Sequence, residues 1–434
     1  MHIVRANNSK AVSVIYSYKT FYSRHAKPVI CMQAIVLAAG EGSRMRPLTA
    51  NRPKVMLPVA GKPLLEHIIV RARFAGVNSF VLVVGYEQNS IRSYFDDGQR
   101  MGVEIDYAIQ DKQLGTGHAL MAARHKAADR FMVLNGDVLP DAGSLQDMAT
   151  QEAAVSAIRV DDPSRYGVFL GRDGIFKSVV EKSENPPSNL ANAGIYVFKG
   201  SIFDALERTP LSTRGEYELT DGLNQLATKE KIKIVSLKSW LEIGRPWDIL
   251  AANEIMLKDL QPSILGEIEP GATIKGNASV GKDTIIRSGA YIVGPVIIGE
   301  GCDIGPNCYI RPSTCIGNNV RIGNAVEAKN SAIMDGSKIG HLSYVGDCVI
   351  GERCNFGAGT ICSNLRHDKA NIKSFIKGER SDSGRRKLGV IMGDGVMTGI
   401  NTTIYPGTVI EPGFRGPPAA VLAGLVAAHS AQEQ

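Results

Sequence analysis

Short apolar runs alternate with helix-like stretches through the first half of the chain. Runs of four or five mainly apolar residues predict buried strands, and apolar positions three and four apart predict helices. The pattern predicts strands over residues 80–84, 105–109 and 131–134, and helices over residues 64–74, closed by Gly76, and 118–125. Strands that alternate with helices indicate a doubly wound, mostly parallel sheet, which binds ligands at the carboxyl ends of its strands.

A six-residue period replaces this alternation in the second half. An aliphatic residue recurs at every sixth position, and a small residue or a valine lies two positions before most of them. The aliphatic positions are Ile268, Ile274, Val280, Ile286, Ile292, Ile298, Ile304, Ile310, Ile316 and Ile322. After two one-residue slips, near Ala328 and before Ile350, the period recurs at Ile404 and Ile410. It is typical of a parallel β-helix, in which each hexad forms one face of a triangular coil and the branched side chain points inward.

Two segments depart from this period. Polar and basic residues 377–387 interrupt it; a solvated loop is the simpler interpretation, and contact with CoA phosphates or a neighbouring subunit is the alternative. The segment after Pro418 is rich in alanine, leucine and valine, and a short helix is expected there.

Four of the seven cysteines occupy the small inner position of the hexads. They are Cys302, Cys308, Cys348 and Cys354. Because this position fits a small apolar side chain, we expect packing residues without a redox or metal role.

The length and charge of the chain indicate how many domains it has and which kinds of partner it does not favour. With 434 residues it exceeds the size at which one hydrophobic core stops growing, which favours two domains. No apolar run is long enough to span a membrane. Five of the six net positive charges fall in residues 1–31, so the remainder is nearly neutral and its charge does not indicate nucleic-acid binding.

Residues 1–31 form a basic leader. They contain no acidic residue and lack the continuous apolar core of a secretory signal. A transit sequence is one interpretation. We favour an over-extended start, with a non-native or disordered leader and Met32 as the working first residue, and we expect a cytoplasmic protein.

A glycine-rich basic loop follows the apolar run at residues 34–37. Glycine lets backbone N–H groups approach phosphate oxygens, and Arg44 and Lys54 supply positive charge. The loop has neither the Gly-Lys-Ser/Thr ending of a Walker A motif nor the acidic residue that follows a dinucleotide fingerprint. We therefore predict a phosphate-binding loop at the carboxyl end of a strand.

This segment resembles the opening of the sugar-1-phosphate nucleotidyltransferases. It reads L-A-A-G-E-G-S-R-M-R-P-L-T at residues 37–49, with R-P-K at 52–54 and K-P-L at 62–64. The resemblance implies catalytic roles for Arg44 and Lys54. It also implies a segment that reads the pyrimidine of UTP or dTTP, because the amide of Gln110 offers a donor and an acceptor to the edge that uracil and thymine share. The implied nucleotide-binding residues are Leu37, Ala38, Ala39, Gly40, Gly42, Gln110, Gly115 and Thr116.

Two carboxylates are candidates for binding Mg²⁺. Asp137 follows the apolar run 131–134 and a glycine, which suits a metal ligand at the carboxyl end of a strand; a turn or cap aspartate is the alternative. The resemblance places a metal-binding aspartate here and a second one in a W-x-D-x-G segment. Glu242 stands in place of that second aspartate and is one methylene longer.

The resemblance also implies a sugar pocket. Tyr166-Gly167, Glu181-Lys182 and Asn192-Ala193-Gly194 match the family's motifs in order. The implied sugar-phosphate ligands are Gly167, Glu181, Lys182 and Asn192.

The predicted β-helix contains a second set of motifs: K-N at residues 329–330, K-I-G-H-L-S-Y-V-G-D at 338–347 and N-F-G-A-G-T at 355–360. This set resembles the acetyltransferase half of the bifunctional glucosamine-1-phosphate acetyltransferase/uridylyltransferases. Histidine suits a base that removes an amine proton at neutral pH, and the resemblance gives this role to His341. Asn364 would orient His341 or the substrate. The implied sugar-phosphate ligands are Arg311, Lys329, Tyr344, Asn355 and Asn364.

Together these observations predict a bifunctional enzyme of nucleotide-sugar synthesis. The expected architecture is a leader (1–31), a Rossmann-like α/β domain (32–258), a left-handed parallel β-helix of hexapeptide repeats (262–418) and a C-terminal tail (419–434). The substrates would be UTP or dTTP, a sugar-1-phosphate and acetyl-CoA, with Mg²⁺ as cofactor. The resemblance implies a homotrimer or a multiple of it. A nucleotidyltransferase with a merely oligomerising β-helix and a non-catalytic regulatory subunit are the alternatives.

Overall fold

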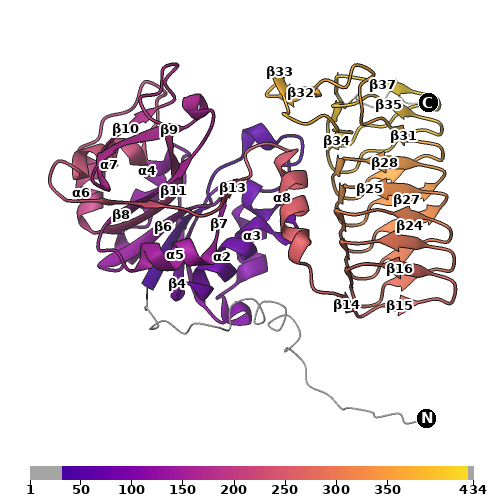
Figure 1. Cartoon of the computed structure of the whole chain (residues 1–434), viewed down its shortest axis with the longest axis horizontal. Helices are drawn as coiled ribbons and strands as arrows, with labels where there is room; N and C mark the ends of the chain where they lie inside the picture. Colours follow the sequence, from indigo (N-terminus) through magenta and orange to yellow (C-terminus); the bar gives the residue numbers. More distant parts are fainter. Residues whose placement is uncertain (1–31, 429–434) are drawn as a thin grey trace, which may run out of the picture.

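The computed structural model describes residues 32–428, so the expectations for the leader and for residues 429–434 lie outside the described residues. An α/β lobe and a β-helix lobe lie side by side, with helix α8 (Asp248–Met256) and the 3₁₀ turn Leu257–Asp259 at their junction (Figure 1). Within the described range, no helix is long and apolar enough to cross a membrane.

A nine-stranded sheet forms the centre of the α/β lobe. Its order is β5-β4-β1-β6-β11-β8-β12-β10-β9. The strands are β1 (Met32–Leu37), β4 (Val77–Val84), β5 (Glu104–Ile109), β6 (Arg130–Asn135), β8 (Ala154–Arg159), β9 (Gly167–Arg172), β10 (Ile175–Glu181), β11 (Leu190–Lys199) and β12 (Lys233–Ser236). The pairs β2 (Pro58–Val59) with β3 (Lys62–Pro63) and β7 (Val138–Pro140) with β13 (Trp240–Glu242) form separate two-stranded sheets.

Strand direction differs between the two halves of this sheet. β1, β4, β5 and β6 are parallel, as the alternation predicts. β11 is antiparallel to β6 and β8, and β10 is antiparallel to β9 and β12. A mostly parallel sheet therefore describes the first half alone, because apolar runs reveal buried strands but carry no information on their direction.

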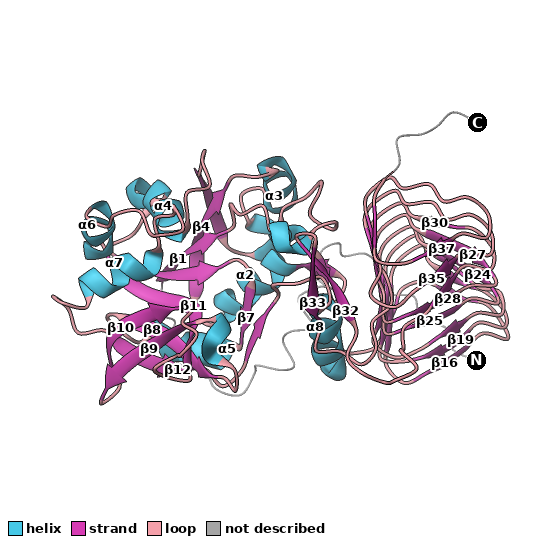
Figure 2. Cartoon of the chain, turned by 90° about the horizontal axis from the view of Figure 1, so that it is seen from above, coloured by secondary structure: helices cyan, strands magenta, loops and turns pink. Residues whose placement is uncertain are grey.

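Helices cover both faces of the sheet (Figure 2). They are α2 (Leu64–Phe74), α3 (Gln88–Phe95), α4 (Thr116–Ala122), α5 (Ala142–Ala149), α6 (Ser201–Glu207) and α7 (Leu219–Leu226). α2, α3 and α5 share one apolar core with Ala34 and Val36 of β1, whereas α4, α6 and α7 share another with Ile35. α2 has the predicted bounds, and the helix predicted over 118–125 starts two residues earlier and ends at Ala122.

Three parallel sheets make up the β-helix. The first, here the β14 sheet, contains β14 (Ser263–Ile264), β17 (Ala278–Val280), β20 (Val296–Ile298), β23 (Thr314–Ile316), β26 (Ala332–Ile333), β29 (Val349–Ile350), β34 (Ile391–Met392), β36 (Val409–Ile410) and β38 (Leu425–Val426). The β15 sheet contains β15 (Glu267–Ile268), β18 (Ile285–Ile286), β21 (Asp303–Ile304), β24 (Arg321–Asn324), β27 (Lys338–His341) and β30 (Asn355–Phe356). The β16 sheet contains β16 (Thr273–Lys275), β19 (Tyr291–Val293), β22 (Tyr309–Ile310), β25 (Glu327–Lys329), β28 (Tyr344–Gly346), β31 (Ile361–Cys362), β35 (Thr403–Ile404) and β37 (Val421–Leu422).

The hexad positions stack inside this coil. Ile286, Ile304, Ile322 and Ile339 pair in register on successive turns of the β15 sheet, and all four are fully buried. Ile268, on the first turn, is 36% exposed because no turn lies beneath it. The predicted period is confirmed, including its one-residue slips.

The inner cysteines pack as predicted. Cys302, Cys308, Cys348 and Cys354 are buried free thiols. Burial raises the pKa of Cys308 and of Cys354 to about 12, so both remain protonated near neutral pH.

The structure corrects two expectations for the C-terminal part. Residues after Pro418 do not form a helix within the described range: β37 pairs with β35 and β38 with β36, so the coil continues to Val426. Leu422 and Val426 keep the inward positions, and composition alone could not separate this ladder from a helix. The polar insertion is not simply a loop, since β32 (Lys373–Ile376) and β33 (Glu379–Asp382) form an antiparallel hairpin.

The β14 sheet faces the α/β lobe. Its inward residues Ile333, Ile350, Met392 and Ile410 belong to the β-helix core. The residues directly before them, Ala332, Val349, Ile391 and Val409, point outward and are buried in the same apolar core as α2 and β1. The two lobes therefore share one apolar interface.

We expect the inward positions to carry the stability of the coil. Ile322→Ala would remove a fully buried side chain and lower the free energy of unfolding by about 2–5 kcal/mol. The neighbouring exposed Arg321→Ala, which points outward, would change it by less than about 0.5 kcal/mol. Urea unfolding followed by circular dichroism measures both, and equal losses in the two variants would contradict this assignment of inward and outward faces.

Candidate active sites

The glycine-rich loop lies at the carboxyl edge of the parallel half of the sheet. The amide of Ala38 donates to the carbonyl of Val83 at 2.9 Å, and the amide of Gly136 donates to that of Leu37 at 3.1 Å. Gly42 has φ 71°, and a Cβ there would lie 2.7 Å from Cβ of Lys54. A side chain at Gly42 would therefore push Lys54 out of the site.

The structure brings Lys54, Asp137 and Glu242 together. Nζ of Lys54 donates to Oδ2 of Asp137 at 2.8 Å. The pairing of β7 with β13 sets Glu242 opposite Val138, and the amide of Ile243 donates to the carbonyl of Asp137 at 2.9 Å. The backbone segments that carry the two predicted metal ligands are thus paired, although 104 residues separate the ligands in sequence.

The charges in this cluster shift its carboxylates in opposite directions. Burial alone raises the pKa of Asp137, but the charge and hydrogen bond of Lys54 and the charge of Arg44 hold it below its ordinary value. Burial raises the pKa of Glu242, and the charge of Asp137 raises it further. Among the described residues, the Glu242 carboxylate has no hydrogen-bond or ion-pair partner.

A cation would relieve this repulsion. Mg²⁺ is commonly held by one or two carboxylates, with waters and substrate phosphates completing its shell. Two carboxylates whose charges act on each other, one of them without a partner among the described residues, fit that ion. Within residues 32–428, no group of three or more His, Cys, Asp or Glu could hold a metal by itself.

The predicted base-reading residues form a second cluster beside the loop. Nε2 of Gln110 donates to the carbonyl of Gly115 at 3.1 Å and lies 3.1 Å from Nδ1 of His118. The hydroxyl of Thr116 accepts from the amide of Leu219 at 3.1 Å, so it also begins α7. The donor side of the Gln110 amide is therefore occupied, and its Oε1 is left for a ligand.

Sequence reasoning assigned no role to two members of this cluster. His118, read as a helix-start residue, holds Gln110, and its ring stacks on that of Tyr217 with centroids 6.4 Å apart. Gln113 donates to the carbonyl of Ala39 at 2.9 Å and joins the cluster to the glycine-rich loop. Gln113 and His118 lie three and eight positions after Gln110, and this closeness in sequence was the signal that could have revealed them.

The predicted sugar-side residues lie on β9, β10 and β11. Glu181 pairs with Gly167, where a Cβ would lie 2.7 Å from Oε1 of Glu181. Asn192 exchanges hydrogen bonds with the hydroxyl of Tyr196 at 2.8 and 3.0 Å. Lys182 follows β10 in a left-handed conformation, with φ 39°. Arg214, missed by sequence reasoning, lies 4.0 Å from Glu181.

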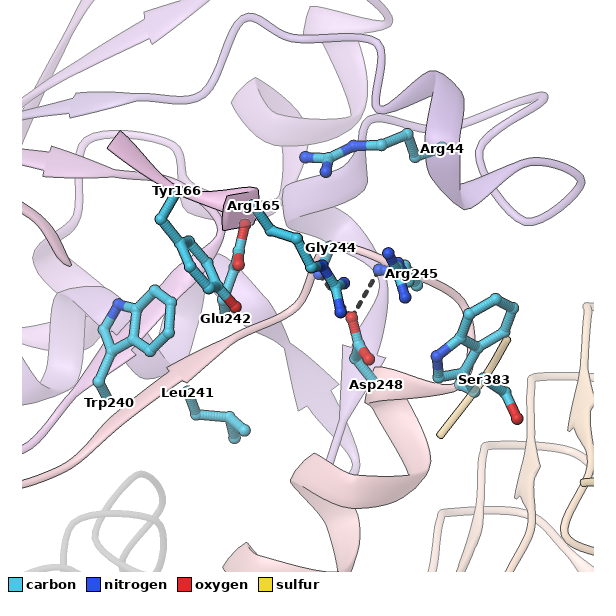
Figure 3. A pocket seen from close by; sticks show the side chains of 11 residues that line it. Arg44, Arg165, Tyr166, Trp240, Leu241, Glu242, Gly244, Arg245, Asp248 and Ser383 are labelled. Carbon is cyan, nitrogen blue, oxygen red and sulfur yellow. Dashed lines mark hydrogen bonds between the residues drawn. The ribbon is translucent and has the colours of Figure 1, made fainter. Parts of the chain in front are cut away.

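A pocket of about 310 Å³ adjoins this cluster. Glu242, Tyr166 and Trp240 line one side (Figure 3). Three arginines, Arg44, Arg165 and Arg245, line it as well, and burial followed by the charge of Arg165 lowers the pKa of Arg245.

Three positive side chains around one pocket favour an anionic ligand. Sequence reasoning missed Arg165 and Arg245. Arg165 directly precedes Tyr166-Gly167, and Arg245 directly follows the segment Glu242-Ile243-Gly244. Ser383, from the β-helix lobe, completes the lining of the pocket (Figure 3).

In the β-helix, three predicted residues and one further carboxylate form one polar network. Nδ2 of Asn364 donates to the hydroxyl of Tyr344 at 3.1 Å and to Oδ2 of Asp347 at 2.6 Å. Nζ of Lys329 lies 3.4 Å from the same Oδ2. Asp347 was not singled out from the sequence, yet its buried carboxylate joins the other three.

The remaining acetyltransferase candidates lie apart from this network. His341 is exposed at the end of β27, and its ring has no hydrogen-bond partner among the described residues. Asn364 is expected to orient His341 or the substrate, and its side-chain amide donates to Tyr344 and Asp347. Asn355 lies on the β15 sheet rather than the β16 sheet of Tyr344, and Arg311 pairs with Glu327 at 2.8 Å.

Comparison with known proteins finds matches for both lobes. Residues 33–259 match the family described as "Nucleotidyl transferase", and residues 292–412 match the "GMPPB C-terminal domain". The chain is 44% identical over 381 residues to the "Bifunctional protein GlmU" of Methanocaldococcus jannaschii, which covers 87% of this chain and 92% of that protein.

Two further relatives differ in how much of the chain they cover. The "Bifunctional sugar-1-phosphate nucleotidylyltransferase/acetyltransferase" of Sulfurisphaera tokodaii is 42% identical over 397 residues, 90% of this chain and 97% of that protein. The "UTP--glucose-1-phosphate uridylyltransferase AglF" of Haloferax volcanii is 39% identical over 227 residues, 50% of this chain and 93% of that protein. The first of these spans both lobes, and the chain belongs to the family of bifunctional sugar-1-phosphate nucleotidylyltransferase/acetyltransferases.

Proposed function

We propose that residues 32–258 transfer a nucleotidyl group from UTP or dTTP to a sugar-1-phosphate. In the same proposal, residues 262–418 acetylate glucosamine-1-phosphate or a related amino-sugar-1-phosphate with acetyl-CoA. The product of the second lobe would then be the substrate of the first, giving UDP-N-acetylglucosamine or a similar nucleotide sugar. The observation that carries the proposal is the cluster of Lys54, Asp137 and Glu242 at the edge of the sheet, next to the phosphate loop.

Nucleotidyl transfer needs positioning and charge neutralisation more than a covalent nucleophile. An oxygen of the sugar phosphate attacks the α-phosphorus, the bond to the β-phosphate breaks, and pyrophosphate leaves. Arg44 and Lys54 neutralise the phosphates, while Asp137 and Glu242 would hold Mg²⁺. When bound, the ion would offset the negative charge that develops on the phosphate oxygens. Leu37, Ala38, Ala39, Gly40 and Gly42 let the triphosphate approach the backbone.

The orientation of the side-chain amide of Gln110 favours uracil or thymine as the base of the nucleotide. Because Nε2 of Gln110 is bonded to Gly115 and His118, its Oε1 accepts from the ring N–H that uracil and thymine share. Glu181, Lys182, Asn192 and the turn at Gly167 hold the sugar and its phosphate. Arg165 and Arg245 add positive charge to the pocket next to this site.

Acetyl transfer would proceed in a ternary complex. His341 removes a proton from the amine, the nitrogen attacks the thioester carbonyl, the C–S bond breaks, and CoA leaves as a thiol. A ring without a partner is free to accept that proton. Lys329 and Arg311 would meet the sugar phosphate, and Tyr344, Asn355 and Asn364 would hold the sugar.

We further propose that the β-helix is left-handed and assembles as a trimer, with acetyl-CoA between neighbouring coils. Three observations support an assembled site. Asn355 and Tyr344 lie on different faces of one chain, His341 lies at the end of a strand between those faces, and apolar side chains are exposed nearby. These apolar residues are Leu342, Ile361, Ile400, Tyr405 and Val421.

The metal cluster predicts a selective loss of nucleotidyl transfer. Asp137→Asn keeps the shape of the side chain but removes the charge that would hold Mg²⁺ and pair with Lys54. Formation of nucleotide sugar from N-acetylglucosamine-1-phosphate, UTP and Mg²⁺ should fall by at least about 100-fold. The control is Asp129→Asn, an exposed aspartate before the start of the same strand, β6. Unimpaired transfer in Asp137→Asn would remove the metal assignment.

The acetyltransferase site predicts a complementary loss. His341→Asn would abolish the base, and CoA thiol release with glucosamine-1-phosphate and acetyl-CoA should fall by about 10²–10⁴-fold. Nucleotidyl transfer should stay unchanged. His367→Asn, at an exposed histidine of the same lobe, serves as the control and should retain thiol release. Thiol release that persists in His341→Asn would overturn the base assignment.

A further inference from the structure

Arg52 belongs to the R-P-K segment of the nucleotidyltransferase site, yet its side chain enters the β-helix lobe. Its Nη2 lies 2.5 Å from Oδ2 of Asp394 and 3.0 Å from Oε1 of Glu352. Its Nη1 lies 3.3 Å from Sδ of Met334. Arg52 and Asp394 are both buried, so this ion pair is shielded from solvent. Arg52 therefore does not serve as a phosphate ligand.

The two carboxylates are held rigidly by the coil. Glu352 follows β29 and Asp394 follows β34, and these strands are paired neighbours. Oδ1 of Asp394 accepts from the amide of Glu352 at 2.8 Å. A Cβ at Gly351 would lie 2.6 Å from that same oxygen, so the turn has no room for another arrangement. The β-helix thus presents a fixed pair of negative charges to Arg52.

A short, stiff connection joins Arg52 to Lys54. Pro53, with φ −70°, is the only residue between them, and its ring restricts the backbone. The 3₁₀ turn that begins at Lys54 follows directly, and the hydroxyl of Tyr86 donates to the carbonyl of Ala50 on the other side at 2.7 Å. A displacement of Arg52 would therefore move Lys54, whose Nζ contacts Asp137.

We propose that Asp394 and Glu352 are positioning residues for nucleotidyl transfer: by holding Arg52, they set Lys54 against Asp137. This inference rests on the proposed nucleotidyltransferase function of that cluster. The β-helix then contributes to nucleotidyl transfer by setting the geometry of the site in the α/β lobe. This contribution is additional to its own proposed acetyltransferase activity.

The same interface contains a second polar cluster that provides a comparison. Glu254 of α8 pairs with Arg385 at 2.5 Å and accepts from Nδ2 of Asn330 at 2.7 Å. Neither contact reaches the segment that carries Lys54. A substitution at Arg385 therefore removes an ion pair between the lobes but keeps the ion pair of Arg52 that positions Lys54.

The test compares Asp394→Asn with Arg385→Gln in the full chain. Asp394→Asn removes the charge that holds Arg52 and keeps the side-chain shape. We expect kcat/KM for nucleotidyl transfer to fall by about 10- to 100-fold, with raised values of KM for UTP and of the Mg²⁺ concentration at half-maximal rate. CoA thiol release should remain at the level of the unsubstituted protein. Arg385→Gln should leave KM for UTP and the Mg²⁺ dependence within about twofold.

Two controls separate positioning from folding. Thermal unfolding gives the folded fraction of each variant, and Glu352→Gln, at the more exposed partner, replaces Asp394→Asn if that variant does not fold. A lower kcat that follows the folded fraction alone, with KM and Mg²⁺ dependence unchanged, would overturn the inference. Equal effects of Arg385→Gln would overturn it too. Absence of nucleotidyl transfer in the unsubstituted protein would instead reject the proposed function.

Discussion

The arrangement of the two lobes depends on the apolar contact between the β14 sheet and the α/β lobe. A strand in a narrow coil must point every second side chain outward, and outward residues are ordinarily polar where they meet solvent. Here Ala332, Val349, Ile391 and Val409 are apolar and buried against the lobe that contains β1 and α2. Each buried methylene stabilises this contact by about 0.8 kcal/mol. The two lobes are thereby packed on each other rather than tethered by a linker alone (Figure 1).

Polar contacts at the same interface extend toward the two candidate sites. On one side, Arg52 joins the Lys54 segment to the turns of the coil. On the other, Asn330 donates to Glu254 of α8 and to Asp347, the carboxylate that also contacts Asn364 and Lys329. Removing one partner of a buried ion pair leaves an uncompensated charge, which costs more than a solvated pair would. In the sequence these partners are ordinary polar and charged residues that lie between 17 and 342 positions apart.

Local chemistry in the sequence predicted much of the fold and of the first site. The hexads revealed the coil because an inward branched residue is required on every face, and the carboxyl end of a strand placed Asp137 beside the phosphate loop. Strand direction in the second half of the sheet was not predictable, since β11 is antiparallel only through its tertiary pairing. The segment after Pro418 misled for a related reason, because its apolar residues suit a helix as well as the last turn of a coil. Arg52 lies within the segment predicted to bind phosphate, and only the position of the other lobe shows that it pairs with carboxylates.

We propose that one chain carries out two reactions in sequence. To follow both reactions, the purified protein is incubated with glucosamine-1-phosphate, acetyl-CoA, UTP and Mg²⁺, and the products are analysed by mass spectrometry over time. We expect release of free CoA and pyrophosphate together with an N-acetylated nucleotide sugar, and accumulation of the acetylated sugar phosphate when UTP is omitted. Formation of a nucleotide sugar that lacks the acetyl group, without release of CoA, would rule out this order of reactions.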